Sequence, residues 1–178
     1  MKTLISSVCL TLCLVALVAG ASAQTTLNFS NLPLVSTPSP MPNGYGRLDW
    51  GNFFYVNPFG WSGAGPGYRL GPRTGDVVFV GGRFCRLDGH ACYGTLADAQ
   101  GFILVSADVS AGFGPAAVTV TAYNNGTYLG TANYFLTTQM RTVNFPSSWG
   151  VATQVVFQVT GDSDGLVMYS LSLYTLGG

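Results

Sequence analysis

The stretch V-T-V-T-A-Y-N-N-G-T-Y-L-G-T-A-N-Y-F-L, residues 118–136, decides the fold class. Apolar and polar side chains alternate over residues 118–123, the period of two that puts them on opposite faces of a β-strand. Asn124-Asn125-Gly126 follows, and these residue types tolerate the positive φ that tight hairpin turns require. Residues 128–136 then form the return strand. The stretch predicts an antiparallel hairpin with one buried face.

Similar strand patterns occur on both sides of this hairpin, separated by turn residues. Pro- and Gly-rich composition predicts irregular segments at residues 31–46 and 57–75, and residues 81–100 are expected to form a long irregular excursion that contains the two cysteines. No segment has a convincing helical period, and the chain has no Lys or Glu after residue 23, which removes two strong helix formers. About nine strands predict an all-β fold, a β-sandwich most consistent with a jelly roll. The further expected strands are 25–29, 50–56, 76–80, 102–109, 141–145, 153–159 and 167–175.

The N-terminus has the features of a cleavable signal peptide over residues 1–23. Lys2 precedes an apolar run from Leu4 to Val18, and Ala21-Ser22-Ala23 is a small-residue cleavage site. The run is shorter than the roughly 20 residues that span a bilayer. We therefore expect a secreted, extracellular protein whose mature chain, residues 24–178, is one β-sandwich domain.

The charge of the mature chain argues against several classes of partner. Six Arg stand against seven Asp, without a basic cluster. Nucleic-acid binding depends on neutralising phosphates, and anionic membranes attract clusters of Lys and Arg. We expect neither nucleic acid nor membrane as a partner after signal cleavage.

Two cysteines, Cys85 and Cys92, lie in the mature chain. In an exported protein such a pair most simply forms one disulfide. Two free thiols are the alternative. His90 lies between them, but one His and two Cys fall short of a closed zinc site.

Residues 42–53, P-N-G-Y-G-R-L-D-W-G-N-F, form the most distinctive block of the chain. With T-L-N-F-S-N-L-P at 26–33 and T-G-D-V-V-F at 74–79, the block resembles a family of small secreted proteins found in fungi and bacteria. Those proteins look like jelly-roll domains of the carbohydrate-binding-module type. The likeness runs in order over nearly the whole mature chain. The family has no settled activity, so the resemblance implies a jelly-roll fold more than a function.

Metal binding has one weak candidate. Members of that family often carry acidic residues after the first strand and in the last one, but residues 29–32 and 167–171 contain none here, so the structural Ca²⁺ that such acids hold is in doubt. Asp162-Ser163-Asp164-Gly165 offers two carboxylates on a tight turn, and Ca²⁺ prefers oxygen ligands. The alternative is a simple polar turn, and we expect no other cofactor.

Catalysis has little support in the sequence. Glycoside hydrolysis normally uses two carboxylates in different environments, and most of the seven Asp lie at strand ends or turns. Asp49, beside Trp50, is the best single candidate for a functional acid. No G-x-S-x-G motif is present. We expect no enzyme, with a glycoside-active enzyme as a minor alternative.

Eight aromatic residues crowd residues 45–68, and flat aromatic rings stack on the C–H faces of sugars. We expect rings on the Gly-rich loop to form an exposed platform, with polar neighbours bonding sugar hydroxyls. The alternative, favoured for Trp50, is that the rings fill the core or pin the loop. The candidate ligand residues are Trp61, Tyr68, Trp50, Asp49 and Arg69.

Two N-glycosylation sequons, at Asn125 and Asn28, matter if the host is a eukaryote. Asn125 is at the expected hairpin tip, whereas Asn28 is within an expected strand. The sequence thus favours a non-catalytic protein that binds glycans at the cell surface or on extracellular polysaccharide. The alternative is a structural or interaction protein of the cell wall or matrix without a sugar ligand.

Overall fold

The computed structural model describes residues 23–70, 77–80, 92–160 and 165–176 of the 178-residue chain. Eleven strands, all paired antiparallel, and two short 3₁₀ turns, Pro66–Tyr68 and Ser147–Trp149, make up its regular structure. The expected all-β fold is therefore confirmed. The strands are β1 (Gln24–Leu27), β2 (Ser39–Pro40), β3 (Asp49–Gly51), β4 (Phe54–Val56), β5 (Val77–Val80), β6 (Cys92–Ala111), β7 (Ala116–Asn124), β8 (Thr127–Leu136), β9 (Arg141–Asn144), β10 (Ala152–Thr160) and β11 (Leu166–Thr175).

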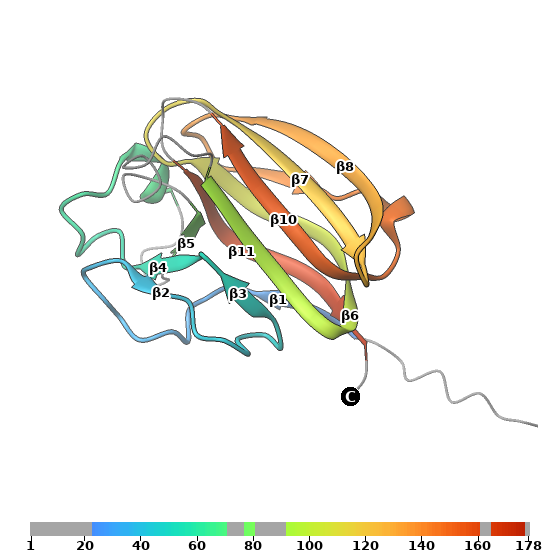
Figure 1. Cartoon of the computed structure of the whole chain (residues 1–178). Helices are drawn as coiled ribbons and strands as arrows, with labels where there is room; N and C mark the ends of the chain where they lie inside the picture. Colours follow the sequence, from blue (N-terminus) through green and yellow to red (C-terminus); the bar gives the residue numbers. More distant parts are fainter. Residues whose placement is uncertain (1–22, 71–76, 81–91, 161–164, 177–178) are drawn as a thin grey trace, which may run out of the picture.

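The long strand β6 belongs to both layers of the sandwich (Figure 1). Its first half pairs with β3 and β10, which gives the order β3–β6–β10–β7–β8, here called the front sheet. Its second half pairs with β9 and β11, and β11 continues to β1 and to β5, β4 and β2, here called the back sheet. The bend between the halves includes Gly101 at φ +88°, a backbone conformation that suits glycine.

The main core lies between the two sheets. On the β7 half of the 118–136 hairpin the inward side chains Val118, Val120 and Ala122 are buried, as their alternation predicts, whereas on β8 Ala132 and Tyr134 are only partly buried. Edge-to-face aromatic contacts continue across the core, with ring centroids 5.7 Å apart for Phe53 and Phe157. Such contacts add to the burial of apolar area that drives the two sheets together.

Two expectations about local structure are wrong. The expected irregular segment 81–100 contains strand from Cys92 onward. The sequence does not reveal this strand, because Tyr93, Thr95 and Ala97 face outward and Leu96 is the one large inward side chain, so the alternation is hidden. The expected strand 50–56 is interrupted at Asn52, whose φ of +57° turns the chain between β3 and β4. With β2, this interruption accounts for eleven strands where about nine were expected.

Candidate functional site

Trp61 and Tyr68 lie on the segment 57–70, which packs on the outward face of the back sheet. Tyr68 is fully buried, so the prediction that it forms an exposed platform is wrong. Its ring meets Trp61 edge-on at 5.2 Å, and Trp61 stacks on Phe79 of β5 at 5.9 Å and 12°. These rings belong to a second, smaller core on the outward face of the back sheet, formed by Val56, Tyr68, Phe79, Val167 and Tyr169. Trp61 is half-buried against it. The aromatic rings pin the segment, the alternative that the sequence left open.

Gly67 anchors this segment to the back sheet. Its carbonyl accepts hydrogen bonds from the Ser110 hydroxyl, at 2.6 Å, and from the Tyr169 hydroxyl. Its amide donates to the Gly112 carbonyl at 2.9 Å. Burial raises the pKa of the Tyr169 phenol, with a smaller opposing effect from hydrogen bonding to Ser110, so the proton that Tyr169 donates is retained.

The remaining candidate ligand residues, Trp50, Asp49 and Arg69, do not converge on one surface. Trp50 is 3% exposed, so its assignment as a ligand residue is wrong and it belongs to the core. Asp49 is exposed on β3, at the edge of the front sheet, across the sandwich from Trp61. Arg69 is exposed, and its Nε donates to the Pro58 carbonyl at 3.4 Å. The structure does not bring the five predicted residues into one site.

The 42–53 block has a structural role. The Trp50 Nε1–H donates to the Tyr45 carbonyl at 2.8 Å, and the Tyr45 hydroxyl donates to Asn31 Oδ1 at 2.6 Å. The indole also meets Phe29 and Phe53 edge-on, at 5.9 and 5.1 Å. The block therefore fastens the chain before β3 to the core.

The outward face of the front sheet, here called the front face, is the best candidate for a binding surface. Strand register arranges its side chains in rows that cross the strands, because directly paired residues share a face. The residue pairs that join β3, β6, β10, β7 and β8 define three such rows, here called the first, middle and third row. The first row is Asp49, Ala97, Gln154, Tyr123 and Tyr128; the middle row is Gly51, Thr95, Val156, Thr121 and Thr131; the third row is Tyr93, Gln158, Thr119 and Asn133.

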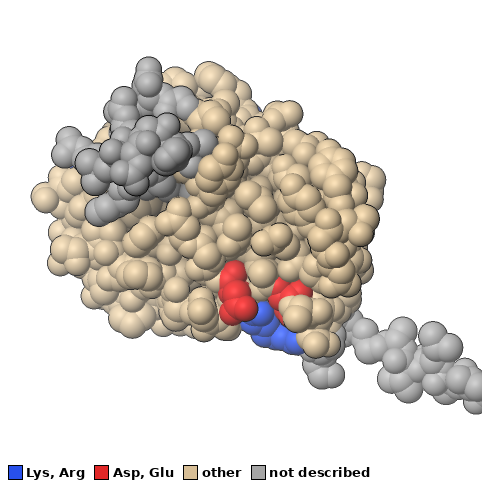
Figure 2. All heavy atoms as spheres, viewed as in Figure 1, with Lys and Arg blue, Asp and Glu red and all other residues tan. Residues whose placement is uncertain are grey.

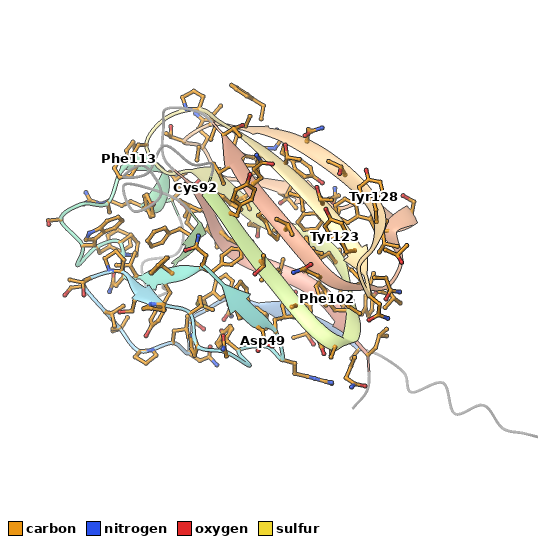
Figure 3. The ribbon with its side chains drawn as sticks, in the orientation of Figure 1. Asp49, Cys92, Phe102, Phe113, Tyr123 and Tyr128 are labelled. Carbon is orange, nitrogen blue, oxygen red and sulfur yellow. The ribbon has the colours of Figure 1, made fainter. Side chains whose placement is uncertain are left out.

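Exposed tyrosine rings stand at both sides of this face. Tyr93 is 47% exposed and Tyr128 is 61% exposed. The rings of Tyr123 and Tyr128 contact each other edge-on at 6.2 Å. Figure 3 shows these two rings near one edge of the face and Asp49 near the opposite edge.

The polar groups of the front face divide into two kinds. On β7 and β8 they bond one another: Thr121 and Thr131 hydroxyls are 3.1 Å apart, and the Thr119 hydroxyl donates to Asn133 Oδ1 at 2.8 Å. On β10, the Gln154 and Gln158 side-chain amides make no hydrogen bond within the described residues. Each amide has donors and an acceptor to offer a ligand.

Charge is almost absent from this face. The three rows contain one charged residue, Asp49, at the β3 end. Figure 2, seen from the side of the front sheet, shows acidic and basic side chains gathered at the lower edge, and the rest of the described surface in this view carries none. The face is therefore suited to a ligand with hydroxyl groups and no net charge.

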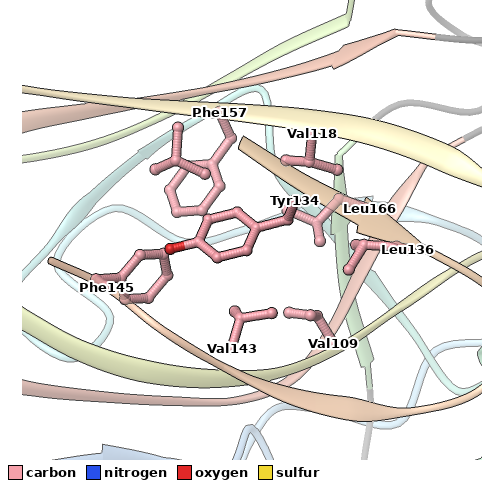
Figure 4. Close-up of a pocket in the computed structure, with 9 residues that line it drawn as sticks. Val109, Val118, Tyr134, Leu136, Val143, Phe145, Phe157 and Leu166 are labelled. Carbon is pink, nitrogen blue, oxygen red and sulfur yellow. The ribbon is translucent and has the colours of Figure 1, made fainter. Parts of the chain in front are cut away.

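A small cavity lies between the sheets near β8 and β9 (Figure 4). Its volume is about 10 Å³, room for at most one water, and its lining is apolar apart from the Tyr134 hydroxyl. That hydroxyl donates to the Asn144 carbonyl at 2.8 Å, and burial raises its pKa, with Arg141 opposing the shift. The cavity is too small for a sugar ligand.

The described carboxylates do not form a catalytic pair. Asp108 lies on the back sheet and accepts hydrogen bonds from Thr142 and Ser170, at 2.6 and 2.8 Å. Asp98 caps the Gln100 amide at 2.8 Å. Asp49 and Ala97 are paired, so Asp98 projects away from the Asp49 face.

The metal and disulfide predictions involve residues outside the described part of the chain. Asp162 and Asp164 lie outside the described residues, within which no group of three or more His, Cys, Asp or Glu could hold a metal. Cys85 is also outside them, so the Cys85–Cys92 bond stays a prediction.

The sequon asparagines have different surroundings. Asn125 is exposed at the β7–β8 turn, where its backbone N–H donates to the Thr153 hydroxyl at 2.7 Å. Asn28 is exposed, but its Oδ1 accepts from the Ser30 hydroxyl at 2.8 Å. Use of either sequon stays a prediction. In the described part of the chain, no helix is long and apolar enough to cross a membrane.

Comparison with known proteins supports the fold. No protein-family model and no curated protein sequence matches the chain. Among solved structures it is similar to a DUF4465 family protein from Bacteroides caccae, with a TM-score of 0.53 and 12% identity over 91% of this chain and 96% of that one. An arabinose-bound α-L-arabinofuranosidase aligns with a TM-score of 0.43 and 12% identity, over 86% of this chain and 26% of that one. The first likeness shows a shared β-fold; the second is too low to support an argument.

Proposed function

We propose that the mature domain is a secreted, non-catalytic carbohydrate-binding protein whose binding surface is the front face. The observation that carries the proposal is the pairing of two tyrosine rings, Tyr93 exposed and Tyr123 half-buried, with glutamine amides that make no hydrogen bond within the described residues. Tyr93 is directly opposite Gln158, and Tyr123 is directly opposite Gln154. Tyrosine rings offer an apolar surface to the C–H faces of sugars, and amides bond their hydroxyl groups.

The rigidity of the sheet favours this function. The ring and amide positions are set by backbone pairing within five antiparallel strands, so little order has to be gained on binding. Within the described residues the face carries one carboxylate, and common glycoside hydrolysis needs two. Binding without cleavage is therefore the better proposal.

Tyr93→Ala is expected to weaken binding to the polysaccharide about tenfold, because a stacking aromatic contributes roughly 1.4 kcal/mol. The measurement is retention on insoluble polysaccharides, with cellulose, chitin, xylan and mannan as probes. Tyr174→Ala is the matched control, since Tyr174 is half-buried on the outward face of the back sheet. Binding should persist in the control. If the wild-type protein binds no polysaccharide, a structural role in the wall or matrix becomes the better account.

A further inference from the structure

Side-chain length differs among the three rows of the front face. The middle row contains only Gly, Thr and Val, whose side chains are short. The first row has Gln154, Tyr123 and Tyr128 on one side, with the short Ala97 on β6. The third has Tyr93, Gln158 and Asn133 on the other, with the short Thr119 on β7. Short side chains thus run across the strands between two sets of longer ones.

The Gln154 and Gln158 amides, which make no hydrogen bond within the described residues, stand on either side of this middle row. Gln154 and Gln158 are the residues two before and two after Val156, so all three project from the same face of β10. A chain lying over Val156 would meet one amide from each side. The hydroxyls of Thr121 and Thr131, 3.1 Å apart, lie in the same row.

The length of the middle row exceeds that of a single sugar. It crosses five strands, and four inter-strand spacings give about 19 Å. The row is open at the surface of the sheet rather than closed into a pocket, and the Tyr128 hydroxyl bonds to Thr131 at its β8 end at 3.1 Å. A surface of this form suits the interior of an extended chain more than a chain end.

The charge of the rows restricts the ligand further. None of the three rows contains Lys or Arg, so sugar carboxylates or sulfates would find no cationic partner among these described residues. Asp49, at the β3 end of the first row, would repel them. Neutral sugars carry no such penalty.

We propose that the front face binds several consecutive units of a neutral, extended polysaccharide chain, which lies across the strands along the middle row. Its hydroxyls bond the Gln154 and Gln158 amides, and the tyrosine rings flank it. This inference rests on the proposed carbohydrate binding and specifies the ligand class and direction.

The test is a calorimetric series from a monosaccharide to a hexasaccharide, prepared from whichever neutral polysaccharide retains the protein, with oligogalacturonides as the acidic comparison. We expect the affinity to rise at least about tenfold from monosaccharide to hexasaccharide, and no binding of the acidic series. Equal affinity for monosaccharide and hexasaccharide, or preference for the acidic series, would overturn this inference while leaving carbohydrate binding intact. Failure of every glycan to bind would instead overturn the proposed function.

A substitution within the middle row tests the position of the chain. Val156→Arg should weaken hexasaccharide binding at least about tenfold, because its long side chain fills the row. Ile103→Arg is the control, since Ile103 is also half-buried but faces outward on the back sheet. Val156→Ala, which keeps the row open, should bind within about twofold of wild type and guards against a folding defect. Unchanged binding by a folded Val156→Arg protein would contradict the proposed path.

Discussion

Gly67→Ala is expected to destabilise the protein by about 3 kcal/mol, the upper end of the usual range for overpacking. A Cβ built on Gly67 would lie 1.8 Å from the Ala111 carbonyl oxygen. The new Cβ is fixed to the main chain and its neighbour is a main-chain oxygen, so no side-chain rotation can remove the clash. The segment 57–70 would have to move off the back sheet. Movement would loosen the hydrogen bonds that Ser110 and Tyr169 donate to the Gly67 carbonyl. Denaturant unfolding, followed by tryptophan fluorescence, measures the loss.

Gly60→Ala is the matched control for this experiment. It is on the same segment, but a Cβ there would be 3.4 Å from the Ser36 Cβ and would make a nearly ordinary contact. Its free energy of unfolding should differ from wild type by less than about 1 kcal/mol. A Gly67→Ala protein as stable as the Gly60→Ala protein would show that the segment is not anchored as described.

Trp50→Ala is expected to cost about 3–5 kcal/mol of stability, the usual range for truncating a core aromatic. The indole is buried, contacts Phe29, Tyr45 and Phe53, and donates a hydrogen bond to the Tyr45 carbonyl. Truncation removes these contacts and leaves the carbonyl without its donor. Thermal and denaturant unfolding both measure the effect.

Trp50→Phe separates the two contributions, because it retains an aromatic ring but loses the indole N–H. It should be less destabilised than Trp50→Ala. Tyr93→Ala supplies the opposite control, since the Tyr93 ring is partly exposed and should affect stability by less than about 1 kcal/mol. A Trp50→Ala protein with wild-type stability and reduced glycan binding would restore Trp50 as a ligand residue.

The parts of the fold that depend on local pattern could be predicted from the sequence. The 118–136 hairpin combines alternation with turn residues, and the structure has β7 and β8 there. The first half of β6 could not be predicted this way, because Tyr93, Thr95 and Ala97 face outward and only Leu96 gives the apolar signal of a buried face. At Asn52 a positive φ, which no alternation rule indicates, ends β3.

The candidate site could be predicted only in its chemistry. The proposed site uses the predicted residue types, aromatic residues with polar neighbours, whereas long-range packing fully or partly buries most rings of the crowded segment 45–68. Phe79 and Tyr169 are distant in sequence from Tyr68, yet they form its surroundings. The front face is assembled from five strands, and its rows depend on pairing register between residues as distant as Asp49 and Gln154. The one local signal was the outward alternation of Thr119, Thr121, Tyr123, Gln154 and Gln158.

The most direct test of carbohydrate binding at the front face is a chemical-shift titration of the isotope-labelled protein with the hexasaccharide of the retained neutral polysaccharide. We predict that the largest shift changes fall on outward residues of the front sheet, led by Tyr93, Gln154, Val156 and Gln158, with those of segment 57–70 nearly unchanged. Shift changes centred instead on Trp61 and Arg69 would contradict the account and place the ligand on the opposite side of the sandwich.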